Sequence, residues 1–239
     1  MTQKLGFCFD FDGTIVNSID IVWKIQDEIL KKYNIKRTEE LDRKIYAKIN
    51  EILHGENRKN IGKPILIAIF KLLGLNLFQR INALILAGKV WKKESQNITL
   101  IEGTEELFEF LEEKGYPFSI ITTSSTLEVE DRLLEKYPHF YNKIKDKLIA
   151  RDVVKNLKPH PESLIKAAEL MKIPVKNCVV VGDMESDIEL GKAIGAITIG
   201  VLTGFLGKEQ FEKLGADFIL NSIAEIPNII NDIERRVNS

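Results

Sequence analysis

Short apolar runs alternate with helical patterns along most of this chain, and this alternation restricts its fold more than any other feature. Six runs are typical of strands, in chain order Leu5–Phe11, Tyr116–Ile121, Leu148–Ala150, Cys178–Val181, Ala196–Val201 and Phe218–Leu220. Strands that alternate with helices pair in parallel, and the helices then cover both faces of the sheet. The pattern predicts an α/β fold with a three-layer core around a parallel sheet.

Helical patterns fill the segments between the later strands. We expect helices over 104–114, 125–137, 161–171 and 186–194, and a final helix that opens at Ser222. Ser125 with Glu128, and Ser222 with Glu225, have the spacing of a capping box, in which side chains bind free backbone N–H groups at a helix start.

One long segment carries no strand signal. From about Val16 to Asn97 the apolar residues recur at helical spacing, as in Ile19, Val22, Trp23 and Gln26. A basic polar loop, 54–63, interrupts this pattern. The chain is therefore predicted to have an α/β core made of residues 1–15 and 98–239, with an all-helical insert over 16–97.

Composition narrows the class of protein. The 239 residues are 44% hydrophobic and 29% charged, which is too apolar for a disordered chain. The 34 Lys and Arg residues are balanced by 35 Asp and Glu residues, whereas nucleic-acid-binding domains usually carry a basic excess. We therefore expect no nucleic-acid partner.

The remaining global features point to a protein of a reducing compartment. The two cysteines, Cys8 and Cys178, lie in apolar runs, which indicates buried thiols rather than a disulfide framework. No apolar stretch has the length of a membrane span, and the first apolar run is too short for a signal peptide. We expect a cytoplasmic protein with no membrane partner.

An acidic loop follows the first predicted strand. Asp10-Phe11-Asp12-Gly13-Thr14 stands at its carboxyl end, where ligands bind in open α/β sheets. Crowded carboxylates repel one another unless a cation or proton intervenes, and Mg²⁺ prefers oxygen ligands. The alternative is a solvated turn, since Asp and Gly are common in turns.

Other strand and helix ends add complementary groups. Asp183 and Asp187 follow the strand at Cys178, Thr122 and Thr123 end the strand at Tyr116, and Lys158 precedes a helix. Each could serve structure alone, Asp187 for example as an acid favoured in a first helical turn. Together they predict a site for a phosphate group and magnesium.

These motifs resemble those of the haloacid dehalogenase-like superfamily of phosphohydrolases. The first is Asp10-Phe11-Asp12-Gly13-Thr14, and Thr122, Lys158 and Gly182-Asp183-x-x-x-Asp187 follow in the family's order. The resemblance covers nearly the whole chain and implies a Rossmann-like core. The insert and the ending Gly215–Ile219 resemble the phosphoglycolate phosphatase-like branch, so the insert is expected to be a cap domain.

The resemblance implies a role for each acidic residue. Asp10 would be the nucleophile that forms an aspartyl-phosphate, and Asp12 would be the general acid and base, oriented by Thr14. Mg²⁺ would be held by Asp10, the backbone carbonyl of Asp12 and Asp183, with Asp187 orienting these ligands.

It also implies phosphate and substrate contacts. Thr122, the Thr123 backbone N–H and Lys158 would bind the phosphoryl oxygens. In the basic loop of the insert, Arg58 and Lys59 are candidates for substrate contact, although a solvated loop is an equally good interpretation.

The sequence thus predicts a phosphoric monoester hydrolase. It would be a magnesium-dependent phosphatase of a small phosphorylated metabolite, with phosphoglycolate as the family's suggestion. A sugar-phosphate mutase of the same fold and a non-catalytic regulatory member are the alternatives. A nucleotide-binding protein is disfavoured, because neither G-x-G-x-x-G nor G-x-x-x-x-G-K-[ST] occurs. The protein is expected to be a monomer or a homodimer.

Overall fold

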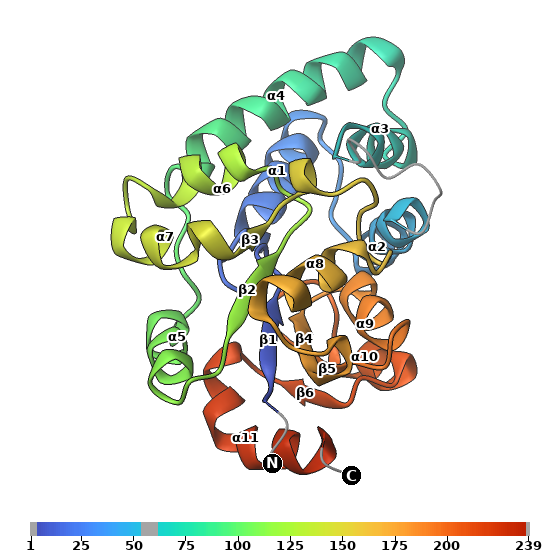
Figure 1. Ribbon diagram of the computed structural model, residues 1–239. Coiled ribbons are helices and arrows are strands. Elements are labelled where there is room, and N and C mark those ends of the chain that lie inside the picture. Colours follow the sequence, from blue (N-terminus) through green and yellow to red (C-terminus); the bar gives the residue numbers. More distant parts are fainter. Residues whose placement is uncertain (1–3, 54–61, 238–239) are drawn as a thin grey trace. The chain divides into compact units, whose positions relative to one another are not determined.

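The computed structural model describes residues 4–53 and 62–237. The chain divides into two compact units, one of residues 1–19 and 98–239 and the other of residues 20–97 (Figure 1). Each unit is described by itself, the first as the sheet unit and the second as the helical unit.

A six-stranded parallel sheet forms the centre of the sheet unit. Its strands are β1 (Gly6–Phe9), β2 (Phe118–Ile121), β3 (Leu148–Ile149), β4 (Cys178–Gly182), β5 (Ile197–Val201) and β6 (Phe218–Leu220). The order across the sheet is β3-β2-β1-β4-β5-β6, so the chain builds outward from β1 in two directions. In register, Phe7 of β1 lies between Phe118 of β2 and Val179 of β4. The predicted parallel α/β fold is confirmed.

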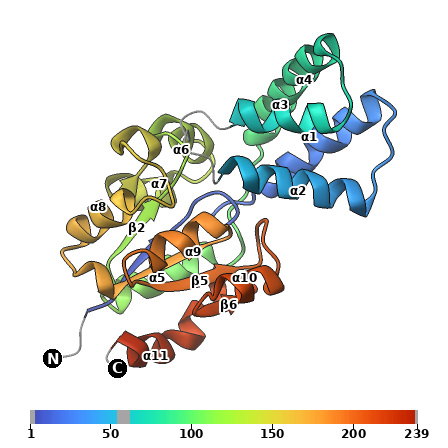
Figure 2. The same ribbon diagram turned by 90° about the vertical axis from the view of Figure 1, so that its right-hand side faces the viewer.

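Helices cover both faces of this sheet (Figures 1 and 2). They are α5 (Thr104–Glu113), α6 (Thr126–Leu133), α7 (Pro138–Ile144), α8 (Glu162–Met171), α9 (Glu185–Lys192), α10 (Lys208–Leu214) and α11 (Ile226–Val237). Short 3-10 turns are η1 (Lys145–Lys147), η2 (Arg151–Val153), η3 (Val175–Asn177) and η4 (Ile223–Glu225).

Alternating residues of β1 supply the two halves of the core. Cys8 packs on one face with residues of α8 and α9 such as Leu164 and Leu190. Phe7 and Phe9 point to the other face, where the Phe9 ring packs against the tilted ring of Phe108 in α5 at 5.1 Å between ring centroids. This period of two is the reason that one short strand can serve both layers. As predicted, Cys8 and Cys178 are free and buried.

The helical unit contains α1 (Ile19–Lys32), α2 (Glu39–Leu53), α3 (Gly62–Leu72) and α4 (Leu77–Ser95), and α1 begins at the boundary between the units. Asn76 caps α4 by accepting from the backbone N–H of Gln79. Lys24 of α1 pairs with Glu94 of α4 at 2.8 Å. The loop residues Arg58 and Lys59, predicted to contact substrate, lie outside the described residues.

Two helices were absent from the prediction. The helix predicted over 125–137 ends at Leu133, and a separate helix, α7, begins at Pro138. The segment at Lys208 forms α10. Both α7 and α10 have only seven residues, so neither repeats an apolar pattern often enough to be recognised. The capping box at Ser125 is confirmed, whereas Ser222 opens the 3-10 turn η4 before α11.

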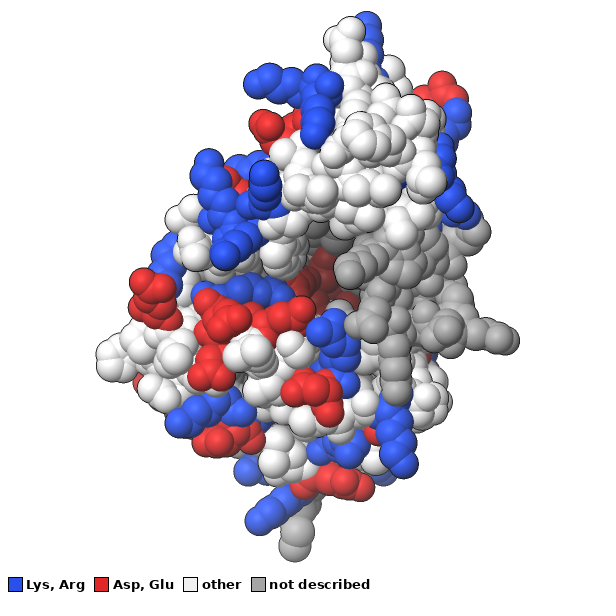
Figure 3. Space-filling model, turned by 90° about the horizontal axis from the view of Figure 1, so that it is seen from above, with Lys and Arg blue, Asp and Glu red and all other residues white. Residues whose placement is uncertain are grey.

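Surface charge shows no large area of one sign on the face in Figure 3, where basic and acidic side chains are interspersed. This agrees with the formal net charge of −1. Within the described ranges, no helix has the length and apolar character needed to cross a membrane.

Candidate active site

The carboxyl ends of the central strands bring the predicted site residues of the sheet unit to one edge of the sheet. Asp10 follows β1 directly, Thr122 follows β2, and Asp183 follows β4. Because β1 lies between β2 and β4, these three residues belong to adjacent strand ends. This is the edge at which open α/β sheets bind ligands.

The loop after β1 is held in a tight turn. The backbone N–H of Asp10 donates to the carbonyl of Val181 in β4 at 2.8 Å, which continues the sheet to the start of the loop. Gly13 has φ of 82°, a left-handed conformation that glycine adopts without strain. Its N–H donates to the Val16 carbonyl, and its own carbonyl accepts from Thr203 Oγ1 at 2.6 Å.

Three buried carboxylates lie together at this edge of the sheet. One oxygen from each of Asp10, Asp183 and Asp187 lies within 4.8 Å of the others. Lys158 enters the cluster and donates from Nζ to Asp10, to Asp187 at 2.5 Å and to the carbonyl of Ile121 at 3.2 Å. One ammonium group thus offsets part of the charge of three carboxylates.

Burial determines the protonation of this cluster. Burial raises the pKa of Asp10 to about 7, because removal from water and the charge of Asp187 outweigh the attraction of Lys158. Burial also raises the pKa of Asp183 well above its usual value, and the charges of Asp10 and Asp187 add to this effect. Lys158 is buried too, but its two carboxylate partners raise its pKa above the usual value. Without a bound cation, the raised pKa values of Asp10 and Asp183 mean that protons neutralise part of the negative charge of the cluster.

The donor set fits a hard divalent cation. Asp183 Oδ2 accepts from the backbone N–H of Phe205 at 3.1 Å, but Asp183 Oδ1 is buried and no donor among the described residues reaches it. A buried carboxylate oxygen without a donor, beside another carboxylate, matches the oxygen ligands that Mg²⁺ takes. Asp10 and Asp183 could hold such an ion, which is the assignment that the resemblance implies. Asp187 accepts from Lys158 and from the backbone N–H of Met184, which fits the predicted orienting role.

The predicted phosphate-binding groups flank the nucleophile candidate. Lys158 binds Asp10 directly. Thr122 is buried, and its Oγ1 accepts from the backbone N–H of Ser124 at 3.0 Å, which fixes the turn after β2. Thr123 is half-buried in that turn. The backbone N–H of Thr122 is used by the carbonyl of Ile149, so the hydroxyl is the group of Thr122 that a ligand could bind.

Asp12 has partners that the sequence did not suggest. We expected Thr14 to orient it, but the buried Thr14 hydroxyl has no hydrogen-bond partner in the described part of the chain. Instead, Arg132 Nη1 donates to Asp12 Oδ1 at 2.6 Å, and Ser124 Oγ donates to Asp12 Oδ2 at 2.9 Å. Helical spacing predicted a helix containing Arg132, but spacing alone gives no sign of which neighbour that side chain meets.

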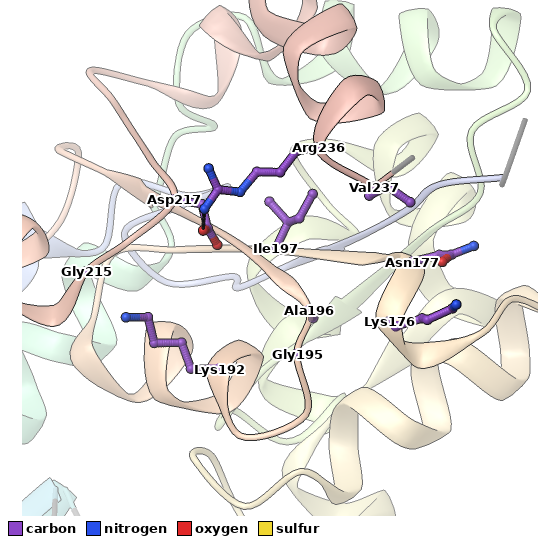
Figure 4. Close-up of a pocket in the computed structure, with 10 residues that line it drawn as sticks. All are labelled: Lys176, Asn177, Lys192, Gly195, Ala196, Ile197, Gly215, Asp217, Arg236 and Val237. Atoms are coloured by element: carbon purple, nitrogen blue, oxygen red, sulfur yellow. Dashed lines mark hydrogen bonds and ion pairs between the residues drawn. The ribbon is translucent and has the colours of Figure 1, made fainter. Parts of the chain in front are cut away.

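A separate pocket of about 620 Å³ lies at the opposite, amino-terminal edge of the sheet (Figure 4). Lys176, Lys192 and Arg236 line it, and Arg236 pairs there with Asp217. The lining residues Asn177 and Ile197 stand at the starts of β4 and β5. This pocket therefore shares no residue with the acidic cluster.

Curated proteins include several relatives of this chain. It is 33% identical over 140 residues to pyrophosphatase PpaX of Bacillus cereus (strain B4264), an alignment that covers 57% of this chain and 63% of that protein. The corresponding protein of Bacillus anthracis (strain CDC 684 / NRRL 3495) is 32% identical over the same length. The alignments span less than two thirds of these relatives.

Solved structures with the same fold cover almost the whole chain. A protein described as a HAD-family hydrolase, from Deinococcus radiodurans R1 and crystallised with bound phosphate and sodium, has a TM-score of 0.75 at 21% identity, covering 98% of this chain and 97% of that one. A predicted phosphoglycolate phosphatase from Haemophilus somnus 129Pt has a TM-score of 0.72 at 21% identity, covering 96% and 99%. At these sequence identities, the similarity shows a shared fold alone.

The family follows from a match that includes the strands and loops of the acidic edge. The family model described as haloacid dehalogenase-like hydrolase matches residues 7–201, from β1 to the end of β5. That range contains Asp10, Lys158 and Asp183. This chain therefore belongs to the haloacid dehalogenase-like hydrolase family.

Proposed function

We propose that this chain is a magnesium-dependent phosphatase that hydrolyses a small phosphorylated metabolite through an aspartyl-phosphate on Asp10. The observation that carries the proposal is the cluster of Asp10, Asp183 and Asp187 around Lys158. A structural cluster would gain little from three carboxylates around one cation, because unpaired buried charge is costly. In a site that binds a cation and a phosphate ester, the carboxylates can bind the cation and the lysine can bind the phosphate.

Asp10 is the proposed nucleophile. One of its carboxylate oxygens bonds to phosphorus while the bond from phosphorus to the leaving oxygen breaks, and this divides one difficult displacement into two steps. Its side chain is only 9% exposed. Water is therefore largely kept from the carboxylate before substrate arrives, and that strengthens the electrostatic interactions within the site.

Asp12 is the proposed proton carrier. It gives a proton to the leaving oxygen in the first step and takes one from the attacking water in the second. Its side chain is 30% exposed, in contrast to Asp10. That exposure suits a group that must meet both substrate and water.

The positive groups have the task of balancing the phosphoryl charge. Lys158 contacts Asp10, so it is within reach of a phosphoryl group bonded to that residue. Thr122 Oγ1 and the Thr123 N–H are the further proposed donors. Transfer of a phosphoryl group depends mainly on positioning and charge stabilisation, which such groups supply.

Asp10, the backbone carbonyl of Asp12, and Asp183 would hold the magnesium ion. A bound magnesium ion supplies positive charge that offsets the charge of the phosphoryl oxygens. The buried Asp183 Oδ1, which has no donor among the described residues, supports this assignment.

The substrate class is proposed as small because the chain lacks the basic excess that a long polyanion would require. Phosphoglycolate is one candidate, and inorganic pyrophosphate is a second that the named relatives suggest. We propose that the helical insert, residues 16–97 by sequence, acts as a cap that selects the substrate, with Arg58 and Lys59 as candidate contacts.

The test is a screen of phosphorylated metabolites with and without Mg²⁺, using the whole chain and its Asp10→Asn variant. We expect metal-dependent phosphate release that falls at least about a thousandfold in Asp10→Asn, since a missing nucleophile removes the catalytic unit as a whole. Asp131→Asn, at an exposed carboxylate of α6, is the matched control and should retain full activity.

Two results would overturn the proposal. Undiminished turnover in Asp10→Asn would exclude the nucleophile, and full activity after exhaustive chelation would exclude the metal. Migration of phosphate within a sugar phosphate without net release would instead identify a mutase.

A further inference from the structure

Asp12, Ser124 and Arg132 form a closed ring of hydrogen bonds. Arg132 Nη1 donates to Asp12 Oδ1 at 2.6 Å, Ser124 Oγ donates to Asp12 Oδ2 at 2.9 Å, and Arg132 Nη2 donates to Ser124 Oγ at 2.8 Å. Each oxygen of the Asp12 carboxylate therefore has its own donor. The three residues come from the loop after β1, the turn after β2 and the last turn of α6.

The Arg132 guanidinium is itself held on its remaining sides. Its side chain is 6% exposed. Nε donates to the carbonyl of Glu128 one turn earlier in α6 at 3.0 Å, and the guanidinium carbon lies 5.4 Å from the centre of the Phe11 ring. A planar guanidinium fixed in this way has few alternative positions, so the carboxylate bound to it has few as well.

Stability alone is a poor explanation of this arrangement. The Arg132 guanidinium is buried and loses its water, a cost that pairing with a carboxylate often fails to repay in full. The carboxylate that Arg132 pairs with is Asp12, two positions after the proposed nucleophile Asp10. A role in orienting Asp12 gives the buried arginine a purpose.

We propose that Arg132 and Ser124 are positioning residues that fix the Asp12 carboxyl group for proton transfer, an inference that rests on the phosphatase function proposed above. A general acid or base must lie within hydrogen-bond reach of the atom it serves. In the first step the bond from phosphorus to the leaving oxygen breaks, and that oxygen takes the proton of Asp12. In the second step a water oxygen bonds to phosphorus, Asp12 takes the water's proton, and Asp10 is released.

Dependence on the leaving group separates positioning of Asp12 from other roles. An aryl phosphate such as p-nitrophenyl phosphate has a leaving group that needs little protonation, whereas an alkyl phosphate such as 2-phenylethyl phosphate needs a proton. For Arg132→Met we expect the first turnover of the alkyl phosphate to slow at least about tenfold, as general acid–base catalysis contributes hundredfold effects or more. The burst of p-nitrophenol should change less than about threefold, and the steady rate after it should fall, because water attack also uses Asp12.

Companion variants give the same experiment its internal checks. Asp12→Asn should show the Arg132→Met pattern more strongly, and Ser124→Ala should show it more weakly. Ser124→Thr keeps the hydroxyl and should restore the activity lost in Ser124→Ala. Arg151→Met is the matched control, because Arg151 pairs with Glu128 of α6, the helix that carries Arg132. This variant should leave the turnover of both substrates unchanged.

Crystal structures of the wild type and Arg132→Met add a readout that needs no activity. The Asp12 side chain should keep one position in the wild type and leave it in the variant. If Arg132→Met does not fold, Arg132→Lys and Ser124→Ala provide the same comparison.

Three results would overturn the inference. They are equal slowing of both substrates in the first turnover, a rise in KM alone, which would indicate phosphate binding by Arg132, and an unmoved Asp12 in the variant. A wild type without metal-dependent hydrolysis of either substrate would instead refute the proposed function, so the two failures are distinguishable.

Discussion

Among single residues, Asp183 is notable because it is buried and one of its carboxylate oxygens has no hydrogen-bond donor within the described residues. Its side chain is almost fully inaccessible, and Oδ1 meets no donor within the described residues. Its own burial, followed by the charges of Asp10 and Asp187, raises its pKa well above the usual value. Without a cation, this carboxylate destabilises the fold that contains it.

Asp183→Asn should therefore stabilise the metal-free protein and remove its response to Mg²⁺. Removing the cost of burying this carboxyl group is expected to raise the free energy of unfolding by about 1–2 kcal/mol, or roughly 2–8 °C in Tm for a chain of this size. Thermal denaturation with and without Mg²⁺ measures both effects. Asp131→Asn serves as the exposed control, and a large Mg²⁺-induced rise in the Tm of Asp183→Asn would contradict the assignment of Asp183 as a ligand.

The role of single residues could be predicted only where the chain itself sets their position. Asp10 and Asp183 follow buried strands, and parallel strands bring their carboxyl ends to one edge, so the acidic cluster followed from the sequence. The roles of Arg132 and Ser124 could not be predicted from the sequence. Their bonds to Asp12 depend on how α6 is rotated against the loop after β1, and no residue spacing reports that rotation.

At the scale of secondary-structure elements, two loops pack closely against Asp183. Neither loop has room for a side chain at its glycine that faces this carboxylate. A Cβ on Gly204, in the loop after β5, would lie 1.8 Å from Asp183 Oδ2. A Cβ on Gly13, in the loop after β1, would lie 2.5 Å from the same oxygen. The carboxylate is thus held between backbone segments from two sides, which limits where a bound cation can sit.

Gly204→Ala should displace Asp183 and weaken metal binding. We expect the Mg²⁺ concentration for half-maximal phosphatase activity to rise at least about tenfold, the size of effect that misplaced metal ligands or their supporting groups produce. Magnesium titration of activity provides the measurement. Gly88→Ala is the matched control, because its Cβ would meet nothing within 4 Å in α4 and should stabilise that helix by about 0.5–1 kcal/mol. Equal magnesium dependence in Gly204→Ala and the wild type would refute the crowding argument.

Elements were predicted best where their ends are chemically marked. β6 was predicted at its observed bounds, Phe218–Leu220, because polar residues flank a short apolar run. The helix starting after Ser125 was marked by its capping box. Its end was placed too late, since Leu134 and Tyr137 continue the apolar spacing beyond the last helical residue, Leu133.

For the molecule as a whole, the buried carboxyl groups make the free energy of unfolding depend on pH. Burial raises the pKa of Asp10 from 3.8 to about 7, so the folded state binds its proton more tightly than the unfolded state. The contribution of this group to stability is fully present below about pH 3.8 and is lost as pH rises through about 7. Asp183 changes in the same direction.

The metal-free protein should consequently lose stability between pH 5 and pH 8, and Mg²⁺ should stabilise it more at pH 8. A cation binds ionised carboxylates, and ligand that binds only the folded state raises the free energy of unfolding. Thermal denaturation at both pH values, with Mg²⁺ or with chelator, tests this. Asp10→Asn should show a smaller loss, and an equal Mg²⁺ effect at both pH values would contradict the account.

The most direct test of the central claim is identification of the residue that carries the phosphoryl group during turnover. The protein is mixed with Mg²⁺ and p-nitrophenyl phosphate, quenched in acid within the first turnover, and mapped by peptide mass spectrometry. The account predicts a phosphoryl group on Asp10 and none in Asp10→Asn. Turnover with the group on another residue, or with no phosphorylated residue in a quench that captures the p-nitrophenol burst, would contradict it.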